Sequence, residues 1–398
     1  MKTIPREEYL AKLRSLQDQS IIKVITGVRR CGKSTLLKLF SAELLEKGVS
    51  DSRIQYINFE DPKYSYNINW HDIYSDIEDK LIKGKMNYIF LDEVQYIDEF
   101  ERLLIGLQTQ ENVDLYVTGS NSHMLSSELA TLLSGRSIEI SMLPLSFKEY
   151  VEAIDDNSIS LETHFSNYLS FGGFPQAVSI FEQNPGSVDS YLSGVYETVV
   201  GRDIMDRKEV TDKSTLNLVV RYLLDNIGNP TSVNNISDEL DVSRYKIDQI
   251  VNALTASFLF YKLNRFDIKG KEILKTQEKY YSVDLGLRWA MLGRDAANDM
   301  GFLLENIVFL ELKRRGNKIF IGKIDDKEVD FIVRDTNGMT SYYQVSWTVG
   351  DQQTLARELA PFEKISDYNA RYLITTDKEE ISHNGIQQLN IINWLLGH

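Results

Sequence analysis

The residues that could do the most specific chemistry lie near the N-terminus, in the run GVRRCGKS from Gly27 to Ser34. An apolar stretch, 21–26, precedes this run, and the segment after it has Leu37, Phe40 and Leu44 at helical spacing. A loop of this form can turn successive backbone N–H groups onto an anion, because glycines stand where side chains would obstruct a phosphate. The helix that follows directs its positive end to the same point. The sequence therefore predicts a nucleotide phosphate site in preference to a chance glycine turn.

The residues of this loop have different expected roles. Lys33 should reach the β- and γ-phosphates, and Ser34 should offer its hydroxyl to Mg²⁺. We expect the whole run to bind nucleotide, through Gly27, Val28, Arg29, Arg30, Cys31, Gly32, Lys33, Ser34 and Thr35. The side chains of Arg29 and Arg30 have no required role in phosphate binding and could contact a neighbouring subunit or be solvated.

A second segment, 88–91, is apolar and runs directly into Asp92 and Glu93, which is the Walker B form. A strand that is apolar on both faces indicates a parallel sheet covered by helices, and carboxylates at its C-terminal edge face the ligand crevice. We expect Asp92 to hold the Mg²⁺ shell. Glu93 should orient and polarise the water that attacks the γ-phosphate.

A third short apolar strand, 114–118, ends in small polar residues. Ser120 or Asn121 could sense the γ-phosphate from this position. A simple turn is an equally good interpretation of this segment alone.

The runs GVRRCGKST, FLDEVQ and TGSNS together resemble the AAA+ ATPases. With LLSGR, LPLSF and GGFP in the same order, the chain resembles the prokaryotic AAA ATPases that carry a DUF4143 C-terminal region, over essentially its whole length. The resemblance implies an α/β P-loop NTPase with a parallel sheet and a helical lid, followed by a winged-helix domain and an α/β restriction-endonuclease-like domain. It also implies binding and hydrolysis of ATP with Mg²⁺.

The resemblance extends to an arginine near the nucleotide. Arg136, in the LLSGR run, is the candidate arginine finger or phosphate sensor, acting in catalysis with Glu93 and Lys33. A surface arginine at a helix end is the alternative. Arg202 is a second candidate, and the ordinary interpretation is favoured there.

The GGFP run, Gly172–Pro175, resembles an element in the helical lid of signalling NTPases related to AAA+ proteins. By this resemblance Pro175 and Phe174 close over the adenine. A glycine-proline turn between two helices is the ordinary alternative.

Between Lys213 and Tyr281 the pattern is helix, helix, helix, ribbon, which predicts a winged helix. The ribbon has basic residues at positions 262, 265, 269, 271, 275 and 279. Such groups suit contacts with a DNA backbone, although a packing or protein-contact role is the favoured interpretation. The net charge of −14 also weighs against tight duplex binding.

The last hundred residues follow an α-β-β-β-α-β order that resembles the PD-(D/E)xK nuclease core, with an Asn337-Gly338 turn as a strong hairpin signal. Glu305 and Asp330 match two acids of that core, unless they are a solvated helix residue and a strand-end cap. Gln344 and Ser346 stand where the second strand would need an acid and a lysine. We therefore expect an inactive, vestigial nuclease-like domain, because cleavage would need a lysine displaced to another element.

These segments predict four parts in the 398 residues: an ATPase core at 1–145, a helical lid at 146–205, a winged helix at 206–295 and the nuclease-like domain at 296–398. The single cysteine, Cys31, rules out an internal disulfide and suits a reducing cytoplasm. No apolar run approaches the roughly 18 residues of a membrane span, so we expect a cytoplasmic protein with no membrane partner. Whether the chain forms homo-oligomers stays open. The rival function is a signalling or scaffold protein that holds nucleotide with little turnover.

Overall fold

The computed structural model describes residues 4–64, 69–122, 135–156, 158–206, 210–294 and 299–397. The chain forms two compact units: an N-terminal unit, Met1–Met142 with Ala256–Phe258, and a C-terminal unit, Leu143–Thr255 with Leu259–His398. The first boundary lies close to the predicted one at 145. The boundaries predicted at 205 and 295 do not separate compact units.

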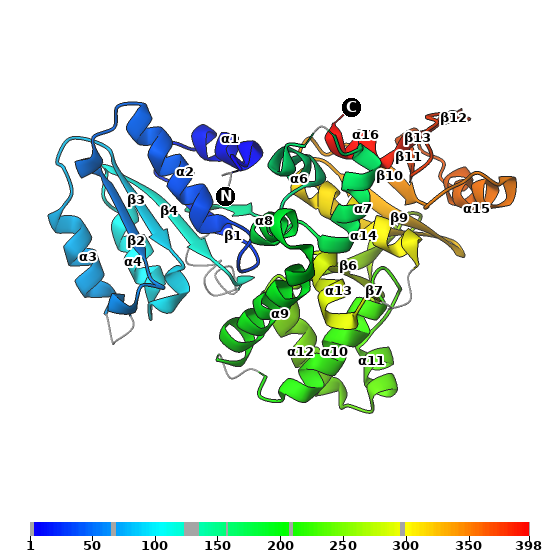
Figure 1. Ribbon diagram of the computed structural model, residues 1–398, viewed down its shortest axis with the longest axis horizontal. Helices are drawn as coiled ribbons and strands as arrows, with labels where there is room; N and C mark the ends of the chain where they lie inside the picture. The colour runs from blue at the N-terminus through cyan, green and yellow to red at the C-terminus, as the bar shows by residue number, and fades with distance from the viewer. Residues whose placement is uncertain are drawn as a thin grey trace. The chain divides into compact units, whose positions relative to one another are not determined.

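The N-terminal unit is built on a parallel sheet with the strand order β2-β3-β4-β1-β5 (Figure 1). The strands are β1 (Ile22–Thr26), β2 (Ile54–Asn58), β3 (Asn87–Asp92), β4 (Val113–Gly119) and β5 (Ser137–Ser141). This confirms the predicted α/β class with a parallel sheet. Because all five strands run the same way, their carboxyl ends meet at one edge, where the predicted site residues follow β1, β3 and β4.

Helices cover both faces of this sheet, which explains why every residue of β1, β3 and β4 is buried. The helices are α1 (Glu7–Ser15), α2 (Lys33–Glu46), α3 (Trp70–Asp79) and α4 (Phe100–Gln108). On one face, Phe40 of α2 packs its ring edge-on against Phe90 and at a tilt against Tyr116. On the other, Leu103 and Leu104 of α4 join the apolar cluster of the strands. The apolar core thus fixes α2 and the loop before it.

The C-terminal unit begins with helices. They are α6 (Phe147–Ile154), α7 (Leu161–Phe171), α8 (Pro175–Gln183), α9 (Val188–Thr198), a π-helix (Val199–Met205), α10 (Lys213–Asp225), α11 (Val233–Leu240), α12 (Arg244–Ala256) and α13 (Leu285–Leu292). A capping box starts α6, in which the Ser146 side chain accepts from the Glu149 N–H and the Glu149 carboxylate accepts from the Ser146 N–H. Helices α10 to α12 agree with the predicted three-helix pattern.

A mixed sheet of eight strands completes this unit, in the order β12-β13-β11-β10-β9-β8-β6-β7. The strands are β6 (Phe260–Asp267), β7 (Glu272–Ser282), β8 (Lys318–Ile324), β9 (Lys327–Arg334), β10 (Thr340–Val345), β11 (Ala370–Thr375), β12 (Ser382–His383) and β13 (Ile386–Asn390). Its helices are α14 (Met300–Arg314), α15 (Gln352–Glu363) and α16 (Ile391–Leu396).

The ribbon of β6 and β7 belongs to this same sheet, since β6 pairs in parallel with β8 from Arg265 opposite Ile321 to Asp267 opposite Lys323. The pairing satisfies backbone groups that a free ribbon would expose at its edge. The predicted winged helix and nuclease-like domain are therefore continuous in one sheet. Periodicity along the sequence does not reveal which strands become neighbours.

The order α14-β8-β9-β10-α15-β11 agrees with the predicted α-β-β-β-α-β pattern. The predicted hairpin is present, with β9 and β10 antiparallel and Gly338 at φ 80°. Among the described residues, no helix combines the length and apolar character needed to cross a bilayer.

Candidate functional site

The glycine loop connects the carboxyl end of β1 to α2 (Figure 1). Gly27 has φ 149° and Gly32 has φ 109°, conformations that other residues rarely adopt. At Gly27 an added Cβ would lie 2.1 Å from the carbonyl oxygen of Met142, so a larger residue would displace the backbone. The loop therefore has the turn that its glycines predict.

Lys33 is the first residue of α2, and its side chain is buried. Its Nζ donates to the carbonyl oxygens of Gly27, at 3.0 Å, and Val28, at 3.3 Å, and lies 3.3 Å from Glu93 Oε1. Burial lowers the pKa of Lys33, but the Glu93 carboxylate and the nearby Cys31 together raise it further, so the net pKa is raised. Lys33 is thus a charged ammonium inside the loop, in position to bind phosphate oxygens.

Asp92 ends β3 with its carboxylate fully buried. Oδ1 accepts hydrogen bonds from Ser34 Oγ, at 3.0 Å, and Thr118 Oγ1, at 2.6 Å, and Oδ2 accepts from Tyr56 OH, at 2.9 Å. Burial raises the pKa of Asp92, while these hydroxyl groups oppose the rise. The two residues predicted to share Mg²⁺, Ser34 and Asp92, are in direct contact.

This donor set fits Mg²⁺, which prefers hard oxygen ligands and binds through one or two protein groups together with phosphates. Ser34 supplies a hydroxyl and Asp92 a carboxylate. No cluster of three or more His, Cys, Asp or Glu suitable for a metal occurs in the described part of the chain.

Glu93 has a left-handed backbone, with φ 58°, directly after β3. This conformation costs a glutamate about 1–2 kcal/mol, and it is held by the Glu93 N–H, which donates to Thr118 Oγ1 at 2.8 Å. Burial raises the pKa of Glu93, but Lys33 and Arg29 lower it further, so the net pKa is depressed. Glu93 is therefore a carboxylate at neutral pH, as its predicted role with water requires.

Ser120 and Asn121 follow β4 at the same edge of the sheet, and both are buried. Ser120 Oγ accepts a hydrogen bond from Gln95 Nε2 at 3.1 Å, and the same nitrogen donates to Glu93 Oε2. Ser120 is thus linked to Glu93 through one side chain. Sequence reasoning missed Gln95, although its place two residues beyond the Walker B acids was a usable signal.

The expectation that Arg29 is solvated or contacts a neighbour is wrong. Arg29 is buried, donates to Tyr96 OH at 2.9 Å and pairs with Glu60. The loop turns this side chain toward its own unit, where its charge helps to lower the pKa of Glu93. Arg30, at φ 71°, is exposed.

Arg136 lies at the amino end of β5, the edge of the sheet opposite the glycine loop. Its carbonyl accepts from the N–H of Ile22, the first residue of β1, at 2.8 Å. A strand of this length spans about 16 Å, so a role for Arg136 in its own chain's phosphate site is wrong. The side chain is exposed, and a catalytic role for it in a neighbouring copy stays a prediction.

In the C-terminal unit, Pro175 begins α8 and Phe174 is fully buried. Gly172, at φ 75°, and Gly173 lie against Asp284, whose Oδ2 accepts from the Gly173 N–H at 2.6 Å. The contact of Pro175 with adenine stays a prediction. So does a nucleotide role for Arg202, an exposed residue of the π-helix in the same unit.

The four residues of the predicted vestigial site border one cavity of about 350 Å³: Glu305, Asp330, Gln344 and Ser346. Asp330 Oδ2 accepts from the Val345 N–H at 2.8 Å, and Gln344 Nε2 donates to Glu358 Oε2 at 2.9 Å. Folding therefore brings together residues that lie on α14, β9 and β10.

A lysine from the ribbon of the predicted winged helix completes this cluster. Lys279 of β7 is buried, and its Nζ lies 2.8 Å from both Glu305 Oε1 and Glu328 Oε1 and 4.0 Å from Asp330 Oδ1. Burial lowers the pKa of Lys279, but the three carboxylates raise it further. Lys279 is thus buried and paired, and it is not available for the DNA-backbone contacts that basic residues of the ribbon would suit. The aromatic Tyr281, two residues along the same strand face, was the available signal.

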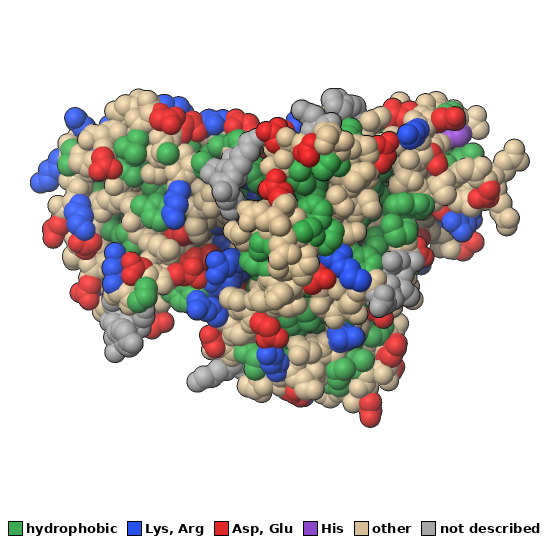
Figure 2. Space-filling view, in the orientation of Figure 1, with side chains coloured by type: hydrophobic (Ala, Val, Ile, Leu, Met, Phe, Trp, Pro, Cys, Tyr) green, Lys and Arg blue, Asp and Glu red, His purple; other side chains and the backbone are tan. Residues whose placement is uncertain are grey.

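Other basic residues of the predicted winged helix have acidic partners. Lys262 pairs with Glu278, Lys269 with Asp325 and Arg265 with Glu328. On α12, Lys246 pairs with Asp212. Basic and acidic side chains are interspersed over the face seen in Figure 2. These pairs reduce the positive field that DNA contact would require.

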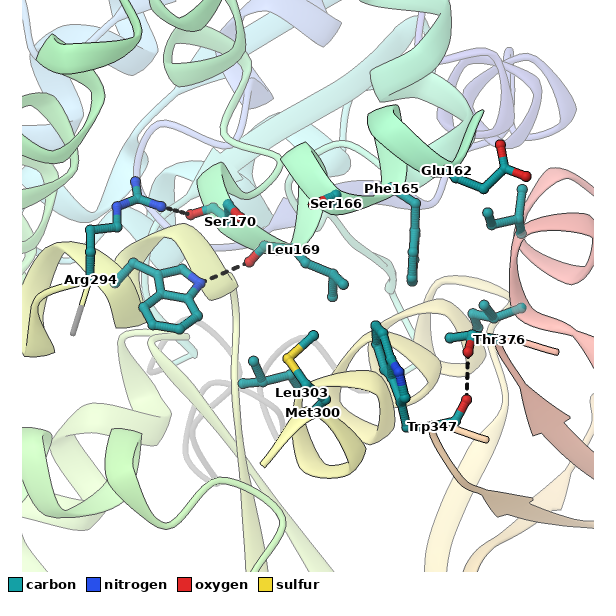
Figure 3. Close-up of a pocket in the computed structure, with 13 residues that line it drawn as sticks. Glu162, Phe165, Ser166, Leu169, Ser170, Arg294, Met300, Leu303, Trp347 and Thr376 are labelled. Atoms are coloured by element: carbon teal, nitrogen blue, oxygen red, sulfur yellow. Dashed lines mark hydrogen bonds between the residues drawn. The ribbon is translucent and has the colours of Figure 1, made fainter. Parts of the chain in front are cut away.

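A further cavity, of about 500 Å³, lies in the C-terminal unit among α7, α13, α14 and Trp347. The Trp289 indole donates to the Leu169 carbonyl, at 3.0 Å, and Arg294 donates to the Ser170 carbonyl, at 2.8 Å. Figure 3 shows Arg294 and Ser170 side by side at this cavity. These two donors are already engaged by backbone carbonyls, and the remaining lining of the cavity is largely apolar.

Comparison with known proteins places these features in a family. Residues 19–151 match the model of an AAA domain. Residues 162–298 match a domain of unknown function, DUF8612. The motifs instead predict a DUF4143 region, which these matches do not show.

Relatives cover most of the chain. An uncharacterized protein of Haemophilus influenzae is 38% identical over 402 residues, which is 99% of this chain and 98% of that protein. An uncharacterized protein of Methanocaldococcus jannaschii is 29% identical over 363 residues, 86% of this chain and 78% of that protein. The structure of a Walker-type ATPase of Pyrococcus abyssi aligns with a TM-score of 0.45 and 15% identity, over 73% of this chain and 96% of that one. The chain therefore belongs to the family of the Haemophilus influenzae protein, and its residues 19–151 match an AAA domain.

Proposed function

We propose that the chain binds ATP with Mg²⁺ in the glycine loop and hydrolyses it. One observation carries this proposal: the Lys33 ammonium and the Glu93 carboxylate face each other at 3.3 Å, beside the contact between Ser34 and Asp92. A cation for phosphate, a carboxylate for water and a hydroxyl-carboxylate pair for Mg²⁺ are thus gathered at one sheet edge.

The protein's part in the reaction follows from these groups. The loop N–H groups and Lys33 bind the β- and γ-phosphates, and Glu93 accepts a hydrogen bond from the attacking water. The water oxygen forms a bond to the γ-phosphorus, the bond to the β–γ bridging oxygen breaks, and the water proton passes to Glu93 or to the released phosphate. Ser34 would hold Mg²⁺ directly and Asp92 would hold its hydration shell, and the bound ion would offset negative charge on the phosphates.

The rival is a protein that holds nucleotide as a fixed ligand. Phosphate release by the full-length chain separates the two, with Glu93→Gln as the test variant and Glu8→Gln, an exposed site on α1, as the matched control. We expect turnover in the wild type and in the control, and a loss of about 100-fold or more in Glu93→Gln with ATP still bound. Equal, near-zero rates in all three proteins, with ATP bound, would favour the rival.

We propose a packing or protein-contact role for the segment from α10 to β7, which we continue to interpret as a winged helix. The ion pairs of its basic residues favour this role over DNA binding. Binding of duplex DNA at low ionic strength, lost steeply as salt is added, would contradict it.

We also propose that the nucleotide changes the arrangement of the helices after residue 146. This requires the nucleotide to bind the two arrangements with different affinities, since a ligand shifts an equilibrium in no other way.

The nuclease-like residues take no part in cleavage in this proposal, since Lys279 is already engaged by carboxylates. Supercoiled plasmid incubated with the protein and Mg²⁺ should remain intact.

A further inference from the structure

Gln95 joins two parts of the nucleotide site that come from different strands. It lies in the short 3-10 turn Val94–Tyr96, directly after Glu93. Its Nε2 donates one hydrogen bond to Glu93 Oε2 and another, at 3.1 Å, to Ser120 Oγ. Glu93 follows β3 and Ser120 follows β4, so one amide connects the ends of two neighbouring strands.

The orientation of this amide is set by charge. If the amide were turned over, its oxygen would face the Glu93 carboxylate, and two acceptors would repel each other. In the observed orientation both N–H groups are used, while Oε1 is buried and has no donor among the described residues. A buried acceptor without a partner is costly, so the two donated bonds must hold the side chain in place.

Two partners compete for the Glu93 carboxylate. Lys33 lies 3.3 Å from Oε1, and Gln95 donates to Oε2. Without Gln95, the ion pair with Lys33 would be the main constraint on the side chain. A carboxylate drawn to the lysine is turned toward a phosphate ligand and away from water.

We propose that Gln95 is a positioning residue that holds the Glu93 carboxylate in a fixed relation to Ser120, so that a phosphate oxygen contacting Ser120 sets the direction of the base. This rests on the proposed ATPase function. In this proposal Ser120 contacts the γ-phosphate, the Gln95 amide links Ser120 to Glu93, and Glu93 orients the water. Gln95 itself touches no reacting atom.

The test is steady-state phosphate release by the full-length chain carrying Gln95→Ala. We expect kcat to fall about 10- to 100-fold, the scale of a misplaced catalytic group, with KM for ATP within about twofold of the wild type. The control is Gln110→Ala. The Gln110 amide donates to Tyr74 and Glu78 away from the site, so its removal should leave kcat unchanged. Thermal unfolding of both variants should match the wild type within a few degrees.

A double-mutant cycle tests the link to Ser120. If Gln95 acts between Ser120 and Glu93, Gln95→Ala combined with Ser120→Ala should be no slower than the slower single variant. Fully additive losses, or a Gln95→Ala enzyme with wild-type kcat, would overturn the inference. A wild type that releases no phosphate would refute the proposed ATPase instead, so the two failures are distinguishable.

Discussion

Lys279 shows how one buried charge can determine the stability of a whole cluster. Three carboxylates surround its ammonium, from Glu305, Glu328 and Asp330, and Tyr281 OH also donates to Glu305, at 2.6 Å. Burial raises the pKa of Glu305 and, with help from the Glu305 charge, that of Asp330. Lys279 opposes the rise in both pKa values, so it favours the charged forms of these acids inside the unit.

Replacing Lys279 with Met should lower the free energy of unfolding by about 3–5 kcal/mol, because buried charges lose their partner. Denaturant unfolding measures this. Lys271→Met, an exposed site in the turn before β7, should change stability by less than about 0.5 kcal/mol. Equal stability of the two variants would show that the carboxylates do not need the lysine.

At the residue scale, spacing alone predicted the loop, Lys33, Asp92 and Glu93, because a short sequence motif determines a local turn. It did not predict Gln95 or the inward position of Arg29, which depend on side-chain directions within that turn. Nor did it predict Lys279, whose partners lie 26 and more residues away.

At the scale of elements, the run Gly172–Pro175 is tied to the start of α13. Asp284 caps that helix, accepting from the Leu287 N–H at 3.2 Å, and its other oxygen accepts from Gly173 at 2.6 Å. A Cβ on Gly172 would lie 2.0 Å from Asp284 Oδ1. One carboxyl group therefore joins α7, α8 and α13.

Gly172→Ala should cost about 2 kcal/mol or more of unfolding free energy, from the left-handed backbone and the displaced carboxyl group. Gly194→Ala is the matched control, because Gly194 lies within α9 with no atom near an added Cβ. It should be neutral or stabilise by up to about 1 kcal/mol. A Gly172→Ala protein as stable as this control would contradict the assigned contact.

Burial raises the pKa of Asp284 from 3.8 to about 7, against the backbone N–H groups that lower it. Because the folded pKa is the higher one, this group's stabilising contribution is complete below its ordinary pKa and is lost as the pH rises through about 7. Unfolding free energy should therefore fall by about 1–2 kcal/mol between pH 5.5 and pH 8. Urea titrations at both pH values should show a smaller fall for Asp284→Asn; an equal fall would assign it to other groups.

The sequence predicted most elements well, including β1, β3, α10 to α12 and the hairpin at Gly338, since each has a strong local pattern. It did not predict that β6 would pair with β8, because no pattern within either strand specifies a partner more than fifty residues away. The elements β12, β13 and α16 also lie beyond the predicted order.

At the scale of the whole molecule, the effect of replacing Arg136 distinguishes an ATPase that is active as a monomer from one that is active only in an assembly. Its position at the amino end of β5 excludes its own phosphate site. We expect Arg136→Ala to leave ATP turnover unchanged at concentrations where the protein is monomeric, and to reduce it about tenfold or more where wild-type turnover rises with concentration. Arg102→Ala, on exposed α4 surface, is the control. Loss of activity in the monomer would contradict the geometry.

The central claim is that backbone N–H groups and Lys33 bind a triphosphate at the carboxyl edge of the N-terminal sheet. Isothermal titration calorimetry of the full-length chain with ATP and Mg²⁺ tests it most directly, with Lys33→Ala as the comparison. The account predicts saturable binding to the wild type and a loss of about tenfold or more in affinity in the variant. No heat of binding in the wild type, or identical titrations of the two proteins, would contradict it.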